Sequence, residues 1–140
     1  MISSRKIEDL TPEMQILCNR LIMDCKAAGM DILITSTYRD FEAQNALYAQ
    51  GRVTSGARVT NAKAGESFHN YRVAFDIVPL CNGKPVWGVN GEDGKLWFKI
   101  GEIGSKYLDW AGKWKTFKEF PHFQLRGITL QQLKEKHGNQ

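Results

Sequence analysis

Apolar residues in the first part of the chain recur at the spacing of a helix. Thr11-Pro12 is typical of a helix start, with an N-cap residue followed by proline at the first helical position, and the pattern stops at Gly29. The apolar positions are Met14, Leu17, Cys18, Leu21, Ile22, Cys25 and Ala28. This pattern predicts an amphipathic helix that packs on the core through one face.

A strand, a second helix and a long loop are predicted next. The β-branched run at residues 32–37 predicts a strand. Asp40 is placed to cap a helix over residues 41–50, which Gly51 would end. Residues 52–66 are rich in Gly, Ser, Thr, Asn and Ala and show little periodicity. We expect a surface loop there, and long loops in compact domains are often functional.

The segment 72–79 alternates in the way a strand does. Val73, Phe75 and Ile77 fall on one face. Asp76 falls on the opposite face with Ala74 and Val78, so its carboxylate is expected to point away from the largest apolar side chains.

The rest of the chain completes an α+β domain. Asn82-Gly83 is typical of a tight hairpin turn. The remaining predicted elements are a strand at 84–87, a helix at 96–108, an irregular strand at 110–114, a strand at 121–125 and a short helix that Thr129 caps and that ends at Gly138. We therefore predict one domain over residues 1–140, with a small, mainly antiparallel sheet flanked by helices.

Composition narrows the class of protein. The 140 residues are 42% hydrophobic and carry a net charge of +4 that is spread along the chain, so nucleic-acid binding is the least favoured interpretation. No segment resembles a signal peptide or a transmembrane span, and we expect a monomer made in the cytoplasm.

Cys18 and Cys25 lie too far apart on their helix for a disulfide, so the three cysteines are expected to be reduced thiols.

His69, Asp76 and His122 can supply the three ligands of a catalytic zinc ion. Such a site keeps its fourth position open for water. A bend at residues 70–71 could aim His69 and Asp76 at one point, and His122 would lie on a neighbouring strand. The same spacing also occurs by chance, and a single histidine is more often structural.

Several motifs resemble those of the LAS-type zinc peptidases (peptidase family M15), the group that holds D-Ala-D-Ala carboxypeptidases and phage L-alanyl-D-glutamate endopeptidases. Residues 67–76, Ser-Phe-His-Asn-Tyr-Arg-Val-Ala-Phe-Asp, are similar to the signature S-x-H-x-x-G-x-A-x-D. Residues 119–122 are similar to the family's E-x-x-H element, 36–39 to its G-Y-R strand end, and 48–52 to its L-Y-x-x-G-R segment. The resemblance runs from about residue 35 to residue 125 in the family's order.

The resemblance implies roles for these residues. Zn²⁺ would be bound by His69, Asp76 and His122 in a cleft on one sheet face. Glu119 would be the catalytic base and Arg39 a substrate-facing cation. Ser67 would hydrogen-bond near the site and contact substrate, or else be an ordinary loop serine. Apart from the resemblance, Gln44 follows Arg39 on the next helix, where it would either face the cleft and bind substrate or lie on a solvated face.

The base assignment depends on local geometry. In an extended strand, a residue three positions before His122 points to the opposite face. Glu119 can therefore act as the base beside His122 only if the chain turns at Pro121 or at Glu119 itself. Asp109 is the reserve candidate for the base.

Two positions depart from the family pattern. Arg72 occupies the position of the signature glycine, which would place a large cation near the site. Ala111-Gly112 replaces a more common Gly-Gly pair. Trp110 and Trp114 on either side of this pair would either line a substrate groove or fill the core.

The implied substrate is the peptide stem of bacterial peptidoglycan. Among members of this family, a short single-domain chain resembles phage endolysins that cut between L-Ala and D-Glu, which implies that the protein stays in the host cytoplasm until a holin releases it. A D,D-carboxypeptidase of the same fold and a non-catalytic, metal-containing binding module are the alternatives.

Overall fold

The structure, a computed structural model, describes residues 1–138, so the last two residues of the predicted domain lie outside it. Its centre is an antiparallel sheet in which β2 pairs with β1 on one side and with β5 and β3 on the other, while β4 extends the sheet beyond β5. The strands are β1 (Asp31–Ser36), β2 (Ala74–Cys81), β3 (Lys84–Pro85), β4 (Asp109–Trp110) and β5 (His122–Gln124). The predicted α+β class with an antiparallel sheet is confirmed.

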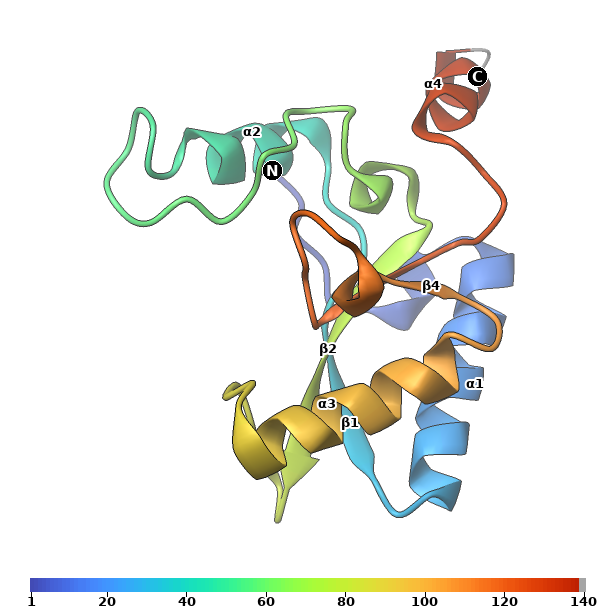
Figure 1. The fold of residues 1–140 in the computed structure, drawn as a ribbon. Coiled ribbons are helices and arrows are strands. Elements are labelled where there is room, and N and C mark those ends of the chain that lie inside the picture. Colours follow the sequence, from blue (N-terminus) through green and yellow to red (C-terminus); the bar gives the residue numbers. More distant parts are fainter. Residues whose placement is uncertain (139–140) are drawn as a thin grey trace.

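Helices surround this sheet (Figure 1). The α-helices are α1 (Pro12–Ala27), α2 (Phe41–Ala49), α3 (Gly91–Gly104) and α4 (Leu130–Gly138), and the 3₁₀ helices are η1 (Ile7–Asp9), η2 (Phe68–Tyr71) and η3 (Ala111–Lys113). α1 and α3 pack against each other and share the core with the sheet. α2 and the long loop that follows it lie near one end of the sheet (Figure 1), and α4 packs against η2 with Leu133 buried in the core.

Three of the four α-helices begin and end within about two residues of their predicted bounds, and the caps explain why. Thr11 Oγ1 accepts a hydrogen bond from the Met14 amide, and Asp40 Oδ1 accepts one from the Ala43 amide. The predicted hairpin turn is also present, with positive φ at Asn82 and Gly83.

Two predicted elements were placed wrongly. α3 begins five residues before the predicted start, because Gly94, one of the glycines that favoured a loop, is required by packing: a Cβ there would lie 2.5 Å from the carbonyl oxygen of Val89. The predicted strand at 110–114 ends at Trp110, and η3 follows it.

The core lies on the face of the sheet to which Phe75 and Ile77 point, as the alternation of residues 72–79 predicts. The rings of Phe75 and Phe123, partners across β2 and β5, stack with centroids 5.8 Å apart. α3 approaches them closely, because a Cβ at Gly104 would lie 2.4 Å from the Phe123 ring. Phe75 and Ile77 are fully buried here, and Asp76 between them faces the other way, as predicted.

The cysteines are free, as predicted. Cys18 and Cys25 are buried on α1, and burial raises the pKa of their thiols to about 12 and about 11. Among residues 1–138, none of the helices combines the length and the apolar character that a membrane crossing requires.

Arg72 adopts the left-handed backbone conformation, with φ 64° and ψ 26°, at the end of η2. This explains why the family signature has glycine there, since a residue with a Cβ is strained in that region. The guanidinium lies 3.8 Å from the centre of the Tyr38 ring and donates to the Asp9 carbonyl oxygen at 2.9 Å. The expected cation near the site is therefore directed elsewhere, toward the N-terminal segment.

We predict that Arg72→Ala destabilises the fold by about 1–2 kcal/mol, because the strain stays while the cation–π contact and the hydrogen bond are lost. Arg72→Gly loses the same contacts but relieves the strain, so it should cost less. Urea unfolding of the three proteins measures this difference. Equal losses for alanine and glycine would show that the conformation at Arg72 carries no strain.

Candidate metal centre

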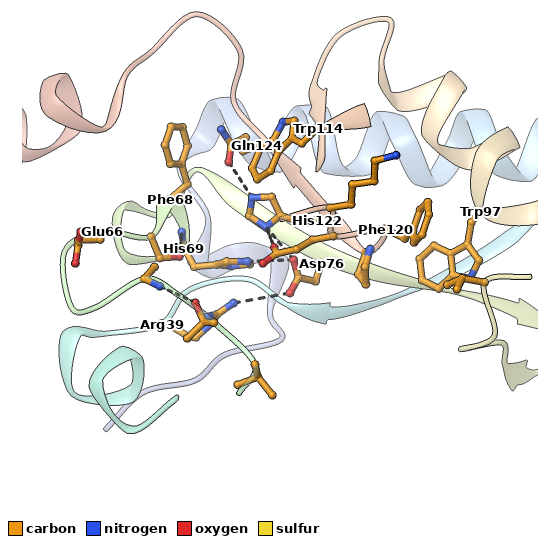
Figure 2. A pocket seen from close by; sticks show the side chains of 18 of the residues that line it. Arg39, Glu66, Phe68, His69, Asp76, Trp97, Trp114, Phe120, His122 and Gln124 are labelled. Carbon is orange, nitrogen blue, oxygen red and sulfur yellow. Dashed lines mark hydrogen bonds and ion pairs between the residues drawn. The ribbon is translucent and has the colours of Figure 1, made fainter. Parts of the chain in front are cut away.

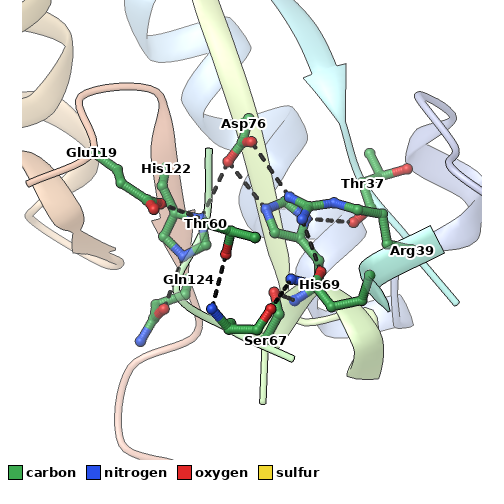
Figure 3. Close-up of polar contacts among 11 residues, drawn as sticks. Thr37, Arg39, Thr60, Ser67, His69, Asp76, Glu119, His122 and Gln124 are labelled. Carbon is green, nitrogen blue, oxygen red and sulfur yellow. Dashed lines mark hydrogen bonds and ion pairs between the residues drawn. The ribbon is translucent and has the colours of Figure 1, made fainter. Parts of the chain in front are cut away.

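The three predicted ligands meet at one point. Asp76 on β2 and His122 on β5 are directly paired across the sheet, and His69 comes from η2. Asp76 Oδ1 lies 3.1 Å from His69 Nε2 and 3.1 Å from His122 Nδ1 (Figure 3). One potential ligand atom from each residue falls in a group whose members all lie within 4.8 Å of one another.

A short, tightly bonded helix places His69. Ser67 Oγ accepts from the His69 amide at 3.2 Å, and Asn70 Oδ1 accepts from the Ser67 amide at 3.3 Å, which forms a capping box. Asn70 Nδ2 also donates to the carbonyl oxygen of Arg39. The predicted bend at residues 70–71 is this helix, and Ser67 both caps it and lines the cavity beside the cluster.

Each histidine is oriented by an acceptor on the side of its ring away from Asp76. His69 Nδ1 lies 2.7 Å from the Thr37 carbonyl oxygen, and His122 Nε2 lies 2.9 Å from Gln124 Oε1. An oxygen of this kind only accepts, so both of these nitrogens carry protons. His69 Nε2 and His122 Nδ1 are then the atoms left to bind a metal ion.

The electrostatics favour an ionised carboxylate between the two rings. Burial alone raises the pKa of Asp76, but the two histidines outweigh burial and hold that pKa well below its usual range. Burial lowers the pKa of His69 against the attraction of Asp76. Burial also acts to lower the pKa of His122, but the hydrogen bond to Asp76 outweighs it, so the net pKa is raised. A proton and a metal ion therefore compete for Nδ1 of His122.

This arrangement fits a metal ion. A neutral His69 carries its proton on Nδ1, so the bare Nε2 faces the ionised oxygen of Asp76 at 3.1 Å. Two acceptors so close repel each other unless a cation lies beside both. Two imidazole nitrogens and one carboxylate oxygen form a donor set typical of catalytic zinc.

Glu119 lies at the edge of the cluster, in the turn that its predicted role requires. The His122 amide donates to the Glu119 carbonyl oxygen at 3.2 Å, which closes a turn over residues 119–122. Glu119 Oε2 is 3.8 Å from His122 Nδ1, and its side chain is 47% exposed. Burial is the main cause that raises the pKa of Glu119, with Asp76 acting in the same sense. A carboxylate with a raised pKa is better suited to accept a proton.

The reserve candidate for the base is wrong. Asp109 lies on β4, where its Oδ1 pairs with Arg126 Nε at 3.0 Å, and it does not line the cavity.

Arg39 and Gln44 act together rather than separately. Arg39 Nη1 donates to Gln44 Oε1 at 2.9 Å, and Nη2 lies 3.8 Å from Asp76 Oδ2. Gln44 is fully buried and donates to the Ala62 carbonyl oxygen at 2.7 Å. The predicted contact of Gln44 with substrate is therefore wrong: Gln44 holds the guanidinium in place and ties α2 to the long loop.

A cavity of about 600 Å³ passes over the cluster, with walls of different character. The polar residues Arg39, Thr60, Glu66 and Ser67, called the polar arm, line one side together with Phe68, and the other side, called the aromatic arm, includes Trp87, Val89, Trp97 and Phe120 (Figure 2). Figure 2 shows Arg39 and Glu66 on one side of the cluster and Phe120 and Trp97 on the other. Trp114 also lines the cavity, whereas Trp110 is buried in the core, so the two predicted roles for this pair are divided between them.

The long loop reaches the cavity because Arg52 holds it. Arg52 Nη1 donates to the carbonyl oxygens of Tyr48 and Thr60, at 2.7 and 3.0 Å. Thr60 then forms part of the cavity wall. The segment that resembles L-Y-x-x-G-R thus has a structural role.

Sequence reasoning missed Gln124 and the aromatic arm. Gln124 could have been found, because it follows His122 by two positions and lies on the same face of a strand. The aromatic arm gives no such signal, because its residues come from three separate segments.

The part of the chain that holds this cluster resembles known proteins. A family described as D-alanyl-D-alanine carboxypeptidase matches residues 60–125. The peptidoglycan L-alanyl-D-glutamate endopeptidase CwlK of Bacillus subtilis is 35% identical over 123 residues, which cover 84% of this chain and 74% of CwlK.

Solved structures share the fold. The L-Ala D-Glu endopeptidase ChiX of Serratia marcescens matches with a TM-score of 0.64 and 19% identity, over 89% of this chain and 88% of ChiX. A variant of the vancomycin-resistance D,D-pentapeptidase VanY in complex with Zn(II) matches with a TM-score of 0.59 and 15% identity, over 90% of this chain and 78% of VanY.

We predict that Gln124→Ala lowers the affinity for Zn²⁺ about 10- to 100-fold, because His122 loses the acceptor that fixes its tautomer. Gln124→Glu keeps an acceptor at this place and should retain most of the affinity. Competition with a chromophoric chelator at fixed pH measures the affinity without any activity assay. Gln131→Ala, on the exposed face of α4, is the matched control, and equal affinities for the two alanine variants would contradict the role of Gln124.

Proposed function

Since this chain belongs to the LAS-type (M15) peptidase family, we propose that it hydrolyses the amide bond between L-Ala and D-Glu in the peptide stem of peptidoglycan, with Zn²⁺ bound by His69, Asp76 and His122. The identity with CwlK supports this choice of bond. The observation that carries the proposal is the convergence of three potential ligands on the wall of a cavity, with Glu119 beside them.

When bound, zinc supplies a Lewis acid that polarises the scissile carbonyl group and lowers the pKa of water. Glu119 accepts a proton from the attacking water on its carboxylate and delivers it to the nitrogen of the leaving amine. Its position at the open edge of the cluster lets it reach both groups.

Arg39 holds a positive charge beside the reacting centre. Its guanidinium is fixed by Gln44 and lines the cavity, so it donates to the developing oxyanion or to a carboxylate of the substrate without first having to be ordered. Burial lowers the pKa of Arg39, and the nearby carboxylates of Asp76 and Glu119 oppose this change. The charge is retained at neutral pH because a guanidinium group is not deprotonated in proteins.

Two other functions remain as outcomes to test. Trimming of terminal D-Ala is supported by the description of the matching family and by the shared fold with VanY. A non-catalytic binding module is disfavoured, because structural zinc sites usually have four protein ligands whereas this cluster has three.

We also propose a lytic role, as in a phage endolysin that reaches the wall from the host cytoplasm. A cut next to L-Ala separates the glycan strand from every cross-link that the stem carries. Loss of turbidity in a suspension of purified cell walls would measure such lysis.

We predict that digestion of purified peptidoglycan releases peptides with a new N-terminal D-Glu and leaves L-Ala on the glycan. Liquid chromatography with mass spectrometry identifies both products. Removal of metal with a chelator should stop the reaction, and added Zn²⁺ should restore it. Free D-Ala as the only product would assign the protein as a D,D-carboxypeptidase instead.

We predict that Glu119→Gln lowers kcat/KM about 10²- to 10⁴-fold, because the amide cannot accept the proton. Bound zinc, measured by elemental mass spectrometry, should stay at one ion per chain, because Glu119 is not among the three ligands. Asp109→Asn is the matched control, since Asp109 lies outside the cavity, and it should keep its activity. Unchanged hydrolysis by Glu119→Gln would exclude Glu119 as the base.

A further inference from the structure

An exposed tryptophan stands at the end of the aromatic arm. Trp87 lines the cavity with 56% of its surface exposed, whereas its neighbour Trp97 is 1% exposed. Their ring centroids lie 6.4 Å apart, and Trp97 in turn lies 6.4 Å from the ring of Phe120. Trp87 therefore continues a row of aromatic rings from the core out to the cavity mouth.

The segment that carries Trp87 is fixed on both sides. Trp97 Nε1 donates to the Gly88 carbonyl oxygen at 2.8 Å, and the Val86 amide donates to the Pro79 carbonyl oxygen at 2.9 Å. The Val89 carbonyl lies against α3 at Gly94, where a Cβ would not fit. The backbone that carries the indole is thus fixed before a ligand arrives, which lowers the entropic cost of binding.

The two arms of the cavity suit different chemical groups. The polar arm holds the fixed cation of Arg39, which suits a carboxylate. The aromatic arm offers the faces of rings and an apolar valine. A linear substrate that crosses the cluster from one arm to the other is therefore bound in one preferred direction (Figure 2).

The proposed substrate has the same asymmetry. On one side of the scissile bond, D-Glu carries a free carboxylate, because it continues the stem through its side chain. On the other side, L-Ala is joined through a lactyl group to the muramic acid sugar. The carboxylate matches the polar arm, and the ring of the sugar, with its face of C–H groups, matches an exposed indole.

We infer that Trp87 forms a subsite for the muramic acid sugar, so that the enzyme prefers stems still attached to glycan over free stem peptides. This inference rests on the proposed function. It assigns the L-Ala side of the substrate to the aromatic arm and the D-Glu side to the polar arm.

The experiment compares two substrates that both carry an amide on the L-Ala nitrogen: a disaccharide-peptide released from peptidoglycan, and the same peptide after removal of the disaccharide and acetylation of the amine that this exposes. kcat/KM is measured for both by mass spectrometry of the cut at L-Ala–D-Glu. We expect Trp87→Ala to lose about tenfold on the disaccharide-peptide and to change little on the free peptide. Trp87→Phe keeps a ring face and should lose much less.

Two further variants separate stacking from apolar bulk and from folding. Trp87→Leu keeps apolar bulk without a ring face and should behave like the alanine variant. Met23→Ala removes an exposed apolar side chain from α1, outside the cavity, and should leave both rates unchanged. Thermal unfolding of each variant checks that the fold is intact.

Equal losses on the two substrates, or no loss on either, would overturn the sugar subsite. Either result leaves the proposed function intact, because the wild-type protein still cuts the bond. Failure of the wild-type protein to cut L-Ala–D-Glu in both substrates would overturn the proposed function itself, and the inference with it.

Discussion

The pairing register between β2 and β5 is the constraint on which both the core and the metal centre depend. Phe75 faces Phe123 and Asp76 faces His122, so consecutive cross-strand pairs point to opposite sides of the sheet. A slip of β5 by one residue would turn the His122 imidazole into the core and the Phe123 ring into the cavity, away from their partners on β2. The stacked phenyl rings, held under α3, therefore fix the position of two of the three potential ligands.

The third ligand depends on a different set of contacts, most of which involve the backbone. The carbonyl oxygen of Thr37 orients the His69 ring. The 3₁₀ helix η2, which Ser67 caps, fixes the backbone position of His69. The same strand end continues into Arg39, whose carbonyl oxygen accepts from Asn70. The end of β1 and the start of β2 are thus joined through the site, so loosening either segment would disturb both the ligand and the cation. A site built on strand ends in this way needs little reorganisation to bind a metal ion.

The sequence predicts those parts of the molecule that local rules determine. The alternation of apolar residues over 72–79 predicts the face of the sheet to which Asp76 points. The geometry of an extended strand predicts that a turn is needed to bring Glu119 beside His122. The ligand trio itself came from the family resemblance, because spacing could not distinguish it from chance. The burial of Gln44 is not predictable from its own helix, because it depends on a hydrogen bond to the carbonyl oxygen of Ala62, in the loop that follows that helix. The start of α3 was misplaced because Gly94 is required by contact with Val89, a contact that composition does not show.

The metal centre and the substrate arms are built from different parts of the fold. The potential ligands are tied to the central strands and η2, so a change there would alter the core as well. The exposed parts of the arms lie on connections: Thr60 and Glu66 on the long loop, and Trp87 and Val89 between β3 and α3. Substitutions on these connections can change which groups flank the scissile bond without moving Asp76 or its partners. Hydrolytic chemistry and substrate choice can therefore vary separately, which is how one fold can serve peptidases that cut different bonds of the same polymer.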